Sequence, residues 1–181
     1  MAAAPGRGEN ARMRPDAPVG DSRPRRAAAG VEIRPVDPTH PDAEHCVGAY
    51  LAELNRRWET GYDPAAGVSA APHELRPPAG VMLVAYRGAE PVGCGALKHR
   101  PGAPTEIKRM WVAESARGLG LGRRLLGALE TRAAAAGAEA VRLETNRNLV
   151  EAIALYRSAG YVEVAPFNDE PFAHHWFEKR L

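Results

Sequence analysis

The residues whose types and spacing best suit chemistry form a glycine-rich turn at 117–124. Residues 117–122 are Arg-Gly-Leu-Gly-Leu-Gly, between a strand-like stretch and an amphipathic helix. Glycines let a ligand approach the backbone closely, and free N–H groups at a helix start attract anions. Arg117, Arg123 and Arg124 add positive charge that suits phosphate. The turn therefore predicts a phosphate-binding site.

Two common phosphate-binding motifs do not match this turn. A P-loop ends in Lys followed by Ser or Thr, which is absent here. A dinucleotide-binding GxGxxG pattern would place its last glycine at Arg123 or Leu125. The remaining alternative to a ligand site is a glycine-rich turn that only packs against its neighbours.

The turn resembles motif A of the GNAT superfamily (GCN5-related N-acetyltransferases), Arg/Gln-x-x-Gly-x-Gly/Ala. The resemblance extends to the preceding strand 110–112, to Ala-Ile-Ala-Leu-Tyr at 152–156 and to Gly-Tyr at 160–161. It implies acetyl-CoA as the acyl donor, no metal, and a primary amine of a small molecule as acceptor, which attacks directly in a ternary complex. The residues that it assigns to the coenzyme are Met110, Trp111, Val112, Arg117, Gly118, Leu119, Gly120, Gly122, Arg123 and Asn148.

Two of these assignments have particular grounds. In the family, a backbone N–H of the strand before motif A polarises the thioester carbonyl, which corresponds to Trp111–Val112 here. The family often has an asparagine seven residues before the catalytic tyrosine, but this chain has Leu149 there and Asn148 one residue earlier. Asn148, or the nearby Asn146, is therefore expected either to contact the pantetheine arm or to cap the helix.

The attacking amine must lose a proton, which calls for a carboxylate or a water chain leading to one. Glu106 is the first candidate base, because charges in a central strand are costly unless they pair or line a cleft. The alternative is that Glu106 pairs with Lys108, two residues along the same strand face. Glu144 in the next strand is the second candidate, and Glu59 and Asp63 are weaker ones.

The departing thiolate gains from an acid, and the resemblance assigns this role to Tyr156. A tyrosine has an unperturbed pKa of about 10 and keeps its proton at neutral pH. The alternative is a buried helical aromatic, because Tyr156 shares the apolar face of its helix with Leu149 and Ala152.

The resemblance places the acceptor side on the first helix, the loop after it and the last strands. The candidate residues there are Arg57, Trp58, Tyr62, His73, 167–170 and 174–176. Lys108 and Arg109 suggest an acceptor that carries a carboxylate or a phosphate. His174 and His175 are adjacent and would face opposite sides of a strand, so they make a poor metal-chelating pair.

These residues belong to an expected α/β (α+β) fold, a single mixed, mostly antiparallel sheet of about seven strands with helices on both faces. Apolar periodicity predicts strands at 31–36, 81–86, 91–97, 106–112, 140–145, 161–164 and 172–179. It predicts helices opened by Thr39, Pro41 and Asp42, from the glycine-rich turn to about Gly137, and over 149–159. The irregular stretch 61–80 is a candidate functional loop.

Charge and composition divide the chain into a tail, 1–29, and an acetyltransferase domain, 30–181. The tail holds six arginines, three acidic residues and few apolar side chains, so we expect disorder. Its arginines are scattered and lack aromatic neighbours, so we expect no nucleic-acid partner. We also expect a cytoplasmic protein with no membrane span or signal, and no disulfide or zinc site at Cys46 and Cys94. Terminal strands favour a homodimer.

Two other functions remain open. In the first, the acceptor is a protein lysine or N-terminus, and the site would need an open acidic groove. In the other, the chain is a catalytically silent sensor that binds acyl-CoA. Tyr156 and the strand carboxylates count against the sensor.

Overall fold

The computed structural model describes Met1 and residues 30–58, 63, 65–67 and 70–181. Almost all of the proposed tail lies outside the described residues, as do Glu59 and Tyr62. The division at residue 30 therefore stays a prediction.

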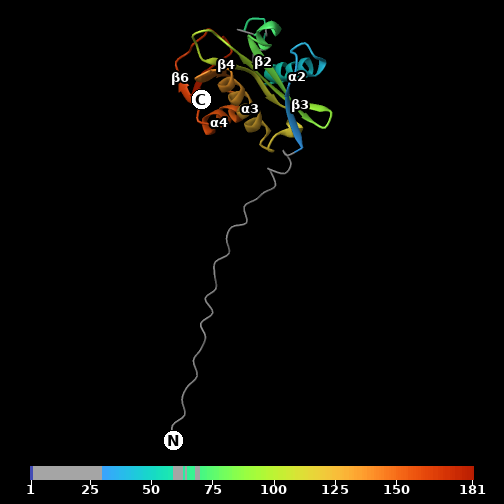
Figure 1. Ribbon diagram of the computed structural model, residues 1–181, viewed down its shortest axis with the longest axis vertical. Helices are drawn as coiled ribbons and strands as arrows, with labels where there is room; N and C mark the ends of the chain where they lie inside the picture. Colours follow the sequence, from blue (N-terminus) through green and yellow to red (C-terminus); the bar gives the residue numbers. More distant parts are fainter. Residues whose placement is uncertain (2–29, 59–62, 64, 68–69) are drawn as a thin grey trace.

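One sheet of seven strands organises the domain (Figure 1). Its spatial order is β1-β2-β3-β4-β5-β7-β6, and every neighbouring pair is antiparallel except β4 and β5. This confirms the expected fold class. The strands are β1 (Val31–Pro35), β2 (Gly80–Arg87), β3 (Glu90–Lys98), β4 (Thr105–Val112), β5 (Ala140–Thr145), β6 (Val162–Val164) and β7 (His175–Arg180).

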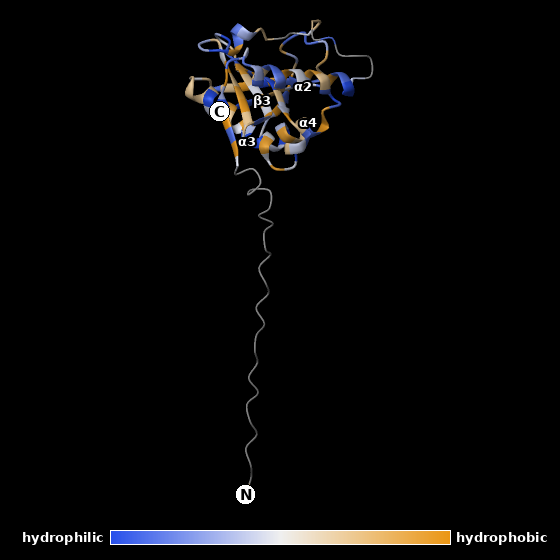
Figure 2. Ribbon diagram, turned by 90° about the vertical axis from the view of Figure 1, so that its right-hand side faces the viewer, coloured by the Kyte–Doolittle hydropathy of each residue, from blue (hydrophilic) through white to orange (hydrophobic). Residues whose placement is uncertain are grey.

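Helices cover both faces of this sheet, as expected. On one face α2 (Pro41–Arg57) packs Ala43 and Cys46 against the buried side chains of β2 and β3. On the other face α3 (Leu121–Ala135) and α4 (Val150–Ser158) form the larger core with Leu83, Leu97 and Phe177. Two 3-10 helices, η1 (Pro72–Leu75) and η2 (Glu114–Ala116), lie in the connections. Figure 2 shows hydrophobic stretches in β3, α3 and α4.

The element boundaries differ from the sequence expectation at two informative places. His40, rather than Thr39, caps α2, because its Nδ1 accepts a hydrogen bond from Asp42 N–H at 3.2 Å. β7 begins at His175 rather than at residue 172. The carbonyl of Phe172 accepts a hydrogen bond from Asn146 Nδ2 at 2.8 Å, so the loop before β7 is fastened to the end of β5.

The feature that creates the site is the divergence of β4 from β5. The two strands pair only at Thr105–Val141 and Glu106–Arg142, and the rest of each strand has no partner across this junction. A bulge in β4 contributes: Arg109 and Met110 together oppose the single residue Gly95, and Arg109 has φ 55°. Bulges bend a strand and strengthen its twist, so β4 turns away from β5 and leaves an opening.

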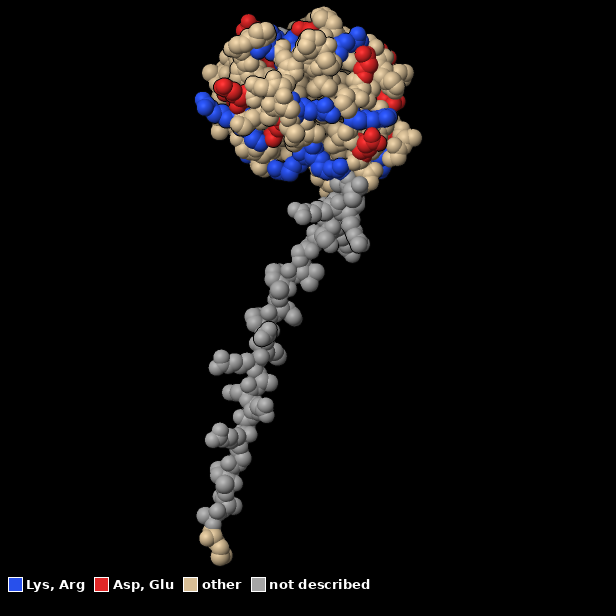
Figure 3. Space-filling view, viewed as in Figure 1, with Lys and Arg blue, Asp and Glu red and all other residues tan. Residues whose placement is uncertain are grey.

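Charged side chains of both signs are interspersed on the face shown in Figure 3. Residues 30–181 hold 18 basic and 19 acidic residues, so this part of the chain is near neutral. No helix in the described part of the chain is both long and apolar enough to cross a membrane.

Candidate active site

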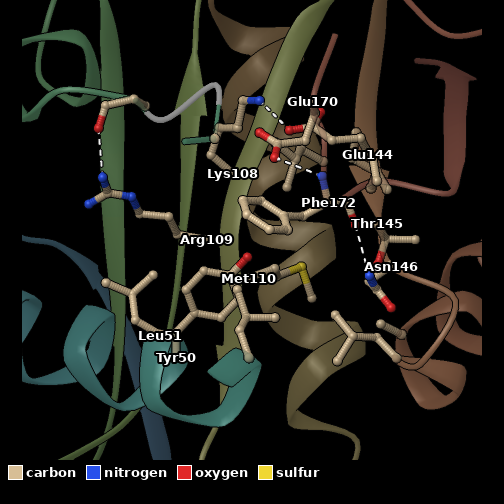
Figure 4. Close-up of a pocket in the computed structure, with 18 of the residues that line it drawn as sticks. Tyr50, Leu51, Lys108, Arg109, Met110, Glu144, Thr145, Asn146, Glu170 and Phe172 are labelled. Carbon is tan, nitrogen blue, oxygen red and sulfur yellow. Dashed lines mark hydrogen bonds and ion pairs between the residues drawn. The ribbon is translucent and has the colours of Figure 1, made fainter. Parts of the chain in front are cut away.

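Two adjoining cavities occupy the opening between β4 and β5. The larger, of about 280 Å³, reaches from the divergence point to the loop before β7 (Figure 4). The smaller, of about 170 Å³, runs toward the glycine-rich turn and is lined by Trp111, Arg117 and Gly122. They share the lining residues Tyr50, Leu54, Met110, Leu149, Ala152 and Tyr156.

The glycine-rich turn has the backbone geometry of a helix start open to an anion. Gly118 and Gly120 have φ of 73° and 78°, which side chains disfavour, and α3 begins directly afterwards at Leu121. A Cβ on Gly122 would lie 3.3 Å from Leu155 Cδ2, so glycine keeps the smaller cavity open. Free amides at such a start suit a pyrophosphate.

The arginines of the turn bind protein groups. Arg123 donates to Ser158 Oγ at 2.6 Å and so connects α3 to α4. Arg124 donates to the carbonyl of Val31 at 2.8 Å. Their guanidinium groups therefore hold the turn in place, and direct contact with phosphate stays a prediction for Arg123.

Glu53 on α2 is a buried carboxylate that the sequence analysis missed. It accepts hydrogen bonds from Trp111 Nε1 at 2.9 Å and from Arg117 Nη2, and it pairs with Arg57 at 2.9 Å. Arg117 also donates from Nε to the carbonyl of Val112 at 3.0 Å. Glu53 thus connects α2, β4 and the start of the turn. The available signal was spacing, because Cys46, Tyr50 and Glu53 recur at helical intervals on the buried face.

Replacing Glu53 with glutamine is expected to destabilise the fold by about 2 kcal/mol, because Arg117 and Arg57 would lose a charged partner that is largely buried. Urea unfolding followed by circular dichroism measures this. Glu90→Gln is the matched control, since Glu90 pairs with Arg87 at the exposed surface. Equal stability of both variants would contradict the role given to Glu53.

Tyr156 lies where the two cavities meet. Its side chain is buried on α4 against the rings of Tyr161 and Phe177, with centroids 5.8 and 6.1 Å away. Burial, together with the nearby Glu144 carboxylate, raises the pKa of Tyr156 above its ordinary value. The hydroxyl therefore keeps its proton well beyond neutral pH. Tyr156 is thus both the buried helical aromatic of the alternative interpretation and a residue that lines both cavities.

The two leading carboxylates occupy different environments. Glu144 lines the larger cavity; its Oε1 accepts from Lys108 Nζ, while Oε2 has no hydrogen-bond partner among the described residues. Glu106 is 1% exposed and is not among the residues that line either cavity. It pairs with Arg142 at 2.8 Å and Arg100 at 2.9 Å.

Ion pairing dominates the titration of Glu106. Burial by itself would raise the pKa of this carboxyl, but the hydrogen bond from Arg142 and the charges of Lys108, Arg100 and Arg142 outweigh it and lower the pKa. The alternative pairing with Lys108 is present at 3.5 Å. A carboxylate with a lowered pKa is a weaker base, and its role as the base stays a prediction.

Some of the other residues predicted for the site lie away from the two cavities. Asn148 donates from Nδ2 to the carbonyl of Arg57 at 2.9 Å and does not line either cavity, so its contact with the pantetheine arm stays a prediction. Asp63 accepts from Ala65 N–H at 2.9 Å in a local turn. Asn146, which lines the larger cavity, was not assigned a role in the acceptor site.

Aromatic rings bound the acceptor end of the larger cavity. Trp58 at the end of α2 meets Phe172 edge to face, with centroids 5.1 Å apart. His174 packs against Trp58 at 5.7 Å, outside the cavity lining. The other acceptor candidates that do not line the larger cavity are Arg57, His73, Phe167, Asn168, Asp169, His175 and Trp176. Within the described residues no group of three or more His, Cys, Asp or Glu could hold a metal ion.

The cations expected to bind an anionic acceptor already have protein partners. Lys108 contacts Glu144 and Glu106. Arg109 donates to the carbonyl of Ala70 and extends away from Glu144 and Glu170 (Figure 4). An acceptor with a carboxylate or phosphate therefore stays a prediction.

Comparison with known proteins gives the family of this fold and site. The model of the acetyltransferase (GNAT) family matches residues 47–161, which include the bulged strand, the turn and Tyr156. The chain belongs to the GNAT family. This confirms the resemblance drawn from the turn and from the Leu-Tyr and Gly-Tyr elements.

Curated relatives of this GNAT chain match part of their length. An "IAA acetyltransferase" of Azospirillum brasilense is 46% identical over 87 residues, 48% of this chain and 57% of the relative. An uncharacterized N-acetyltransferase of Schizosaccharomyces pombe is 35% identical over 98 residues, 52% of this chain and 60% of the relative. The chain thus matches less than two thirds of the length of either relative.

Solved structures share the fold over most of the GNAT chain. A Klebsiella pneumoniae protein assigned as an acyl-CoA N-acyltransferase is 28% identical, with a TM-score of 0.67, covering 83% of this chain and 97% of that one. A GNAT acetyltransferase of Elizabethkingia anophelis with acetyl-CoA bound is 17% identical, with a TM-score of 0.58, covering 84% and 99%. At that identity the second likeness concerns the fold alone.

Proposed function

We propose that this GNAT chain transfers the acetyl group of acetyl-CoA to a primary amine of a small molecule by direct attack in a ternary complex. The observation that carries the proposal is the meeting of Tyr156 and Glu144 at the cavities that lead to the glycine-rich turn. The match to the acetyltransferase (GNAT) family and the relative named "IAA acetyltransferase" support the donor and the reaction class.

The donor would lie along the smaller cavity. Amides of residues 118–122 would hold the pyrophosphate, since they begin α3 and their glycines allow close approach. The pantetheine arm would pass Met110, Trp111 and Val112 toward Tyr156. Beyond Glu106 the strand β4 has no partner in β5, so a backbone N–H in the Trp111–Val112 stretch would polarise the thioester carbonyl.

Glu144 would take the proton of the amine. An alkylammonium with a pKa near 10.4 costs about 4–5 kcal/mol to neutralise at pH 7, so a base in the cavity matters. Glu144 lines the larger cavity, whereas Glu106 lines neither cavity, although the Oε2 atom of each carboxylate has no hydrogen-bond partner among the described residues. Glu106 as the base remains the competing assignment, which mutation of each carboxylate distinguishes.

Tyr156 would assist the departing thiolate. Its pKa is raised above that of a thiol, near 8.5, so a hydrogen bond to the thiolate is favoured over complete proton transfer. The resulting charge-assisted hydrogen bond would form in a buried site, where it is stronger than in water.

A small-molecule acceptor is favoured over a protein acceptor by the shape of the larger cavity. About 280 Å³ bounded by Trp58 and Phe172 suits a compact amine. Thiol release from acetyl-CoA with a panel of small amines, peptides with free N-termini and lysine peptides tests the function. Release with peptides alone would favour the protein acceptor, and tight CoA binding without release would favour a sensor.

Replacing Gly120 with alanine is expected to weaken CoA binding about tenfold. The left-handed backbone at φ 78° costs about 1–2 kcal/mol with a side chain, so the turn would relax and its amides would move. Isothermal titration calorimetry with CoA measures the change. Gly127→Ala is the matched control, since Gly127 lies inside α3 with open space at its Cβ. Unchanged affinity in Gly120→Ala would count against the turn as the pyrophosphate site.

A further inference from the structure

One ammonium group is shared between two buried carboxylates at the point where β4 and β5 separate. Lys108 Nζ contacts Glu144 Oε1 and lies 3.5 Å from Glu106 Oε2. Lys108 and Glu106 are 8% and 1% exposed as side chains, and Glu144 is 10% exposed. The charges are therefore poorly screened by solvent, and each influences the others strongly.

Glu106 is held in place by two arginines on the side away from Lys108 Nζ, through its Oε1 atom. Its Oε1 accepts from Arg142 at 2.8 Å and pairs with Arg100 at 2.9 Å, while its Oε2 faces Lys108. Glu106 and Arg142 are also the last backbone pair before the strands diverge. The carboxylate at the last paired position of β4 is thus the one that competes with Glu144 for Lys108.

We propose that Glu106 is a positioning residue that, through Lys108, sets the proton affinity of the cavity carboxylate Glu144. As long as Glu106 shares the ammonium, Glu144 is only partly neutralised and attracts a proton from the acceptor amine. The consequence for the reaction rests on the proposed function, whereas the coupling itself is a property of the folded chain.

Three electrostatic effects act in the same direction when Glu106 loses its charge. The anion that repels the charge on Glu144 disappears. Lys108 is left with Glu144 alone, and Arg100 and Arg142 lose the carboxylate that compensates them. Each effect favours ionised Glu144, so its proton affinity falls. Removing the charge of Lys108 does the opposite, because Glu144 then loses its cation.

Other charged or titratable groups also lie around the cavity, and their charges are the same in all the variants compared. They lie on each element that packs against the cavity: Tyr50 on α2, Arg109 on β4, Arg142 on β5, Tyr156 on α4 and Glu170 in the loop before β7. The variants below leave these groups in place, so the difference between variants reports Glu106, Lys108 and Arg100.

The direct test is an NMR titration of the Glu144 side-chain carboxyl carbon in full-length protein labelled with 13C at glutamate, without substrate. The resonance is assigned by its absence from Glu144→Gln. Glu106→Gln is expected to move the titration midpoint down by about one pH unit, and Lys108→Met to move it up by about one unit. With an amine acceptor, the acid limb of the kcat/KM profile should shift the same way.

Arg100→Gln keeps the test decisive if Glu106→Gln or Lys108→Met fails to fold, because Arg100 is 40% exposed. Loss of this cation should move the midpoint up by a few tenths of a unit. Glu90→Gln, a surface ion-pair control, should leave it unchanged.

An unchanged or raised midpoint in folded Glu106→Gln would overturn the proposal. An unchanged midpoint in Lys108→Met would overturn it too, as would an unchanged midpoint in Arg100→Gln if the other two variants fail to fold. Loss of the acid limb in Glu106→Gln but not in Glu144→Gln would make Glu106 the base and overturn it too. Absence of thiol release by the wild type with every amine would instead overturn the proposed function, and the substrate-free titration would still decide the coupling.

Discussion

Tyr156→Phe is expected to lower kcat by about 100-fold, the typical effect of removing one preorganised hydrogen-bond donor from a developing anion. Tyr156 lines both cavities and lies on α4, in the segment that follows the glycine-rich turn and α3. The KM values should change little, since the ring remains packed against Tyr161 and Phe177. Steady-state thiol release at saturating acetyl-CoA measures this.

The pH dependence of the wild type gives a second readout of Tyr156. A group whose pKa is raised stays protonated to higher pH, so the acid form is present throughout the neutral and moderately alkaline range. We therefore expect no alkaline loss of kcat from Tyr156 below about pH 10. Tyr161→Phe is the matched control, because Tyr161 contacts Tyr156 but does not line either cavity. Wild-type turnover in Tyr156→Phe at every pH would remove the residue from the mechanism.

Glu144→Gln is expected to lower kcat/KM by about 1,000-fold for an alkylamine at pH 7, within the usual range for general base catalysis. The amide keeps the size of the side chain but cannot take a proton. The acid limb that reports Glu144 should be replaced by a rise that follows the neutral fraction of the amine, so the deficit should shrink as the pH approaches the pKa of the amine. Initial rates between pH 5.5 and 10 measure both effects.

The choice of acceptor provides the control for Glu144. An amine that is already neutral at pH 7 does not need the base, so Glu144→Gln should lose much less activity with a weakly basic amine than with an alkylamine. An equal loss with both acceptors would indicate a binding or structural role. A larger, acceptor-dependent loss in Glu106→Gln would assign the base to Glu106.

The first helix shows why part of the site was not predictable. Apolar periodicity predicted this helix correctly, because a helix with one buried face shows its spacing locally in the sequence. Glu53 lies on that face and hydrogen-bonds to Trp111 and Arg117, which come from segments more than 50 residues away in the chain. The sequence shows that a carboxylate interrupts the apolar face of the helix. It does not show the partners of that carboxylate, because they depend on how α2 crosses β4.

The acceptor end illustrates the same limit. Residues 172–179 were expected to form a strand, yet Phe172 enters the cavity from a loop that Asn146 fastens to β5. Lys108 and Arg109 suggested an anion site from their charge alone. Lys108 contacts carboxylates from its own strand and from β5, and this pairing across the divergence was not readable from its position.

The sequence by itself determined the family, the order of the elements and the glycine-rich turn, because these depend on residues close together in the chain. Strand, glycines and helix follow one another over 110–135, and Tyr156 lies at a set distance beyond them. Only the tertiary structure decided which carboxylate reaches the cavity. That depends on where β4 and β5 stop pairing, and on Arg100 and Arg142, which neutralise Glu106 and leave Glu144 in the opening.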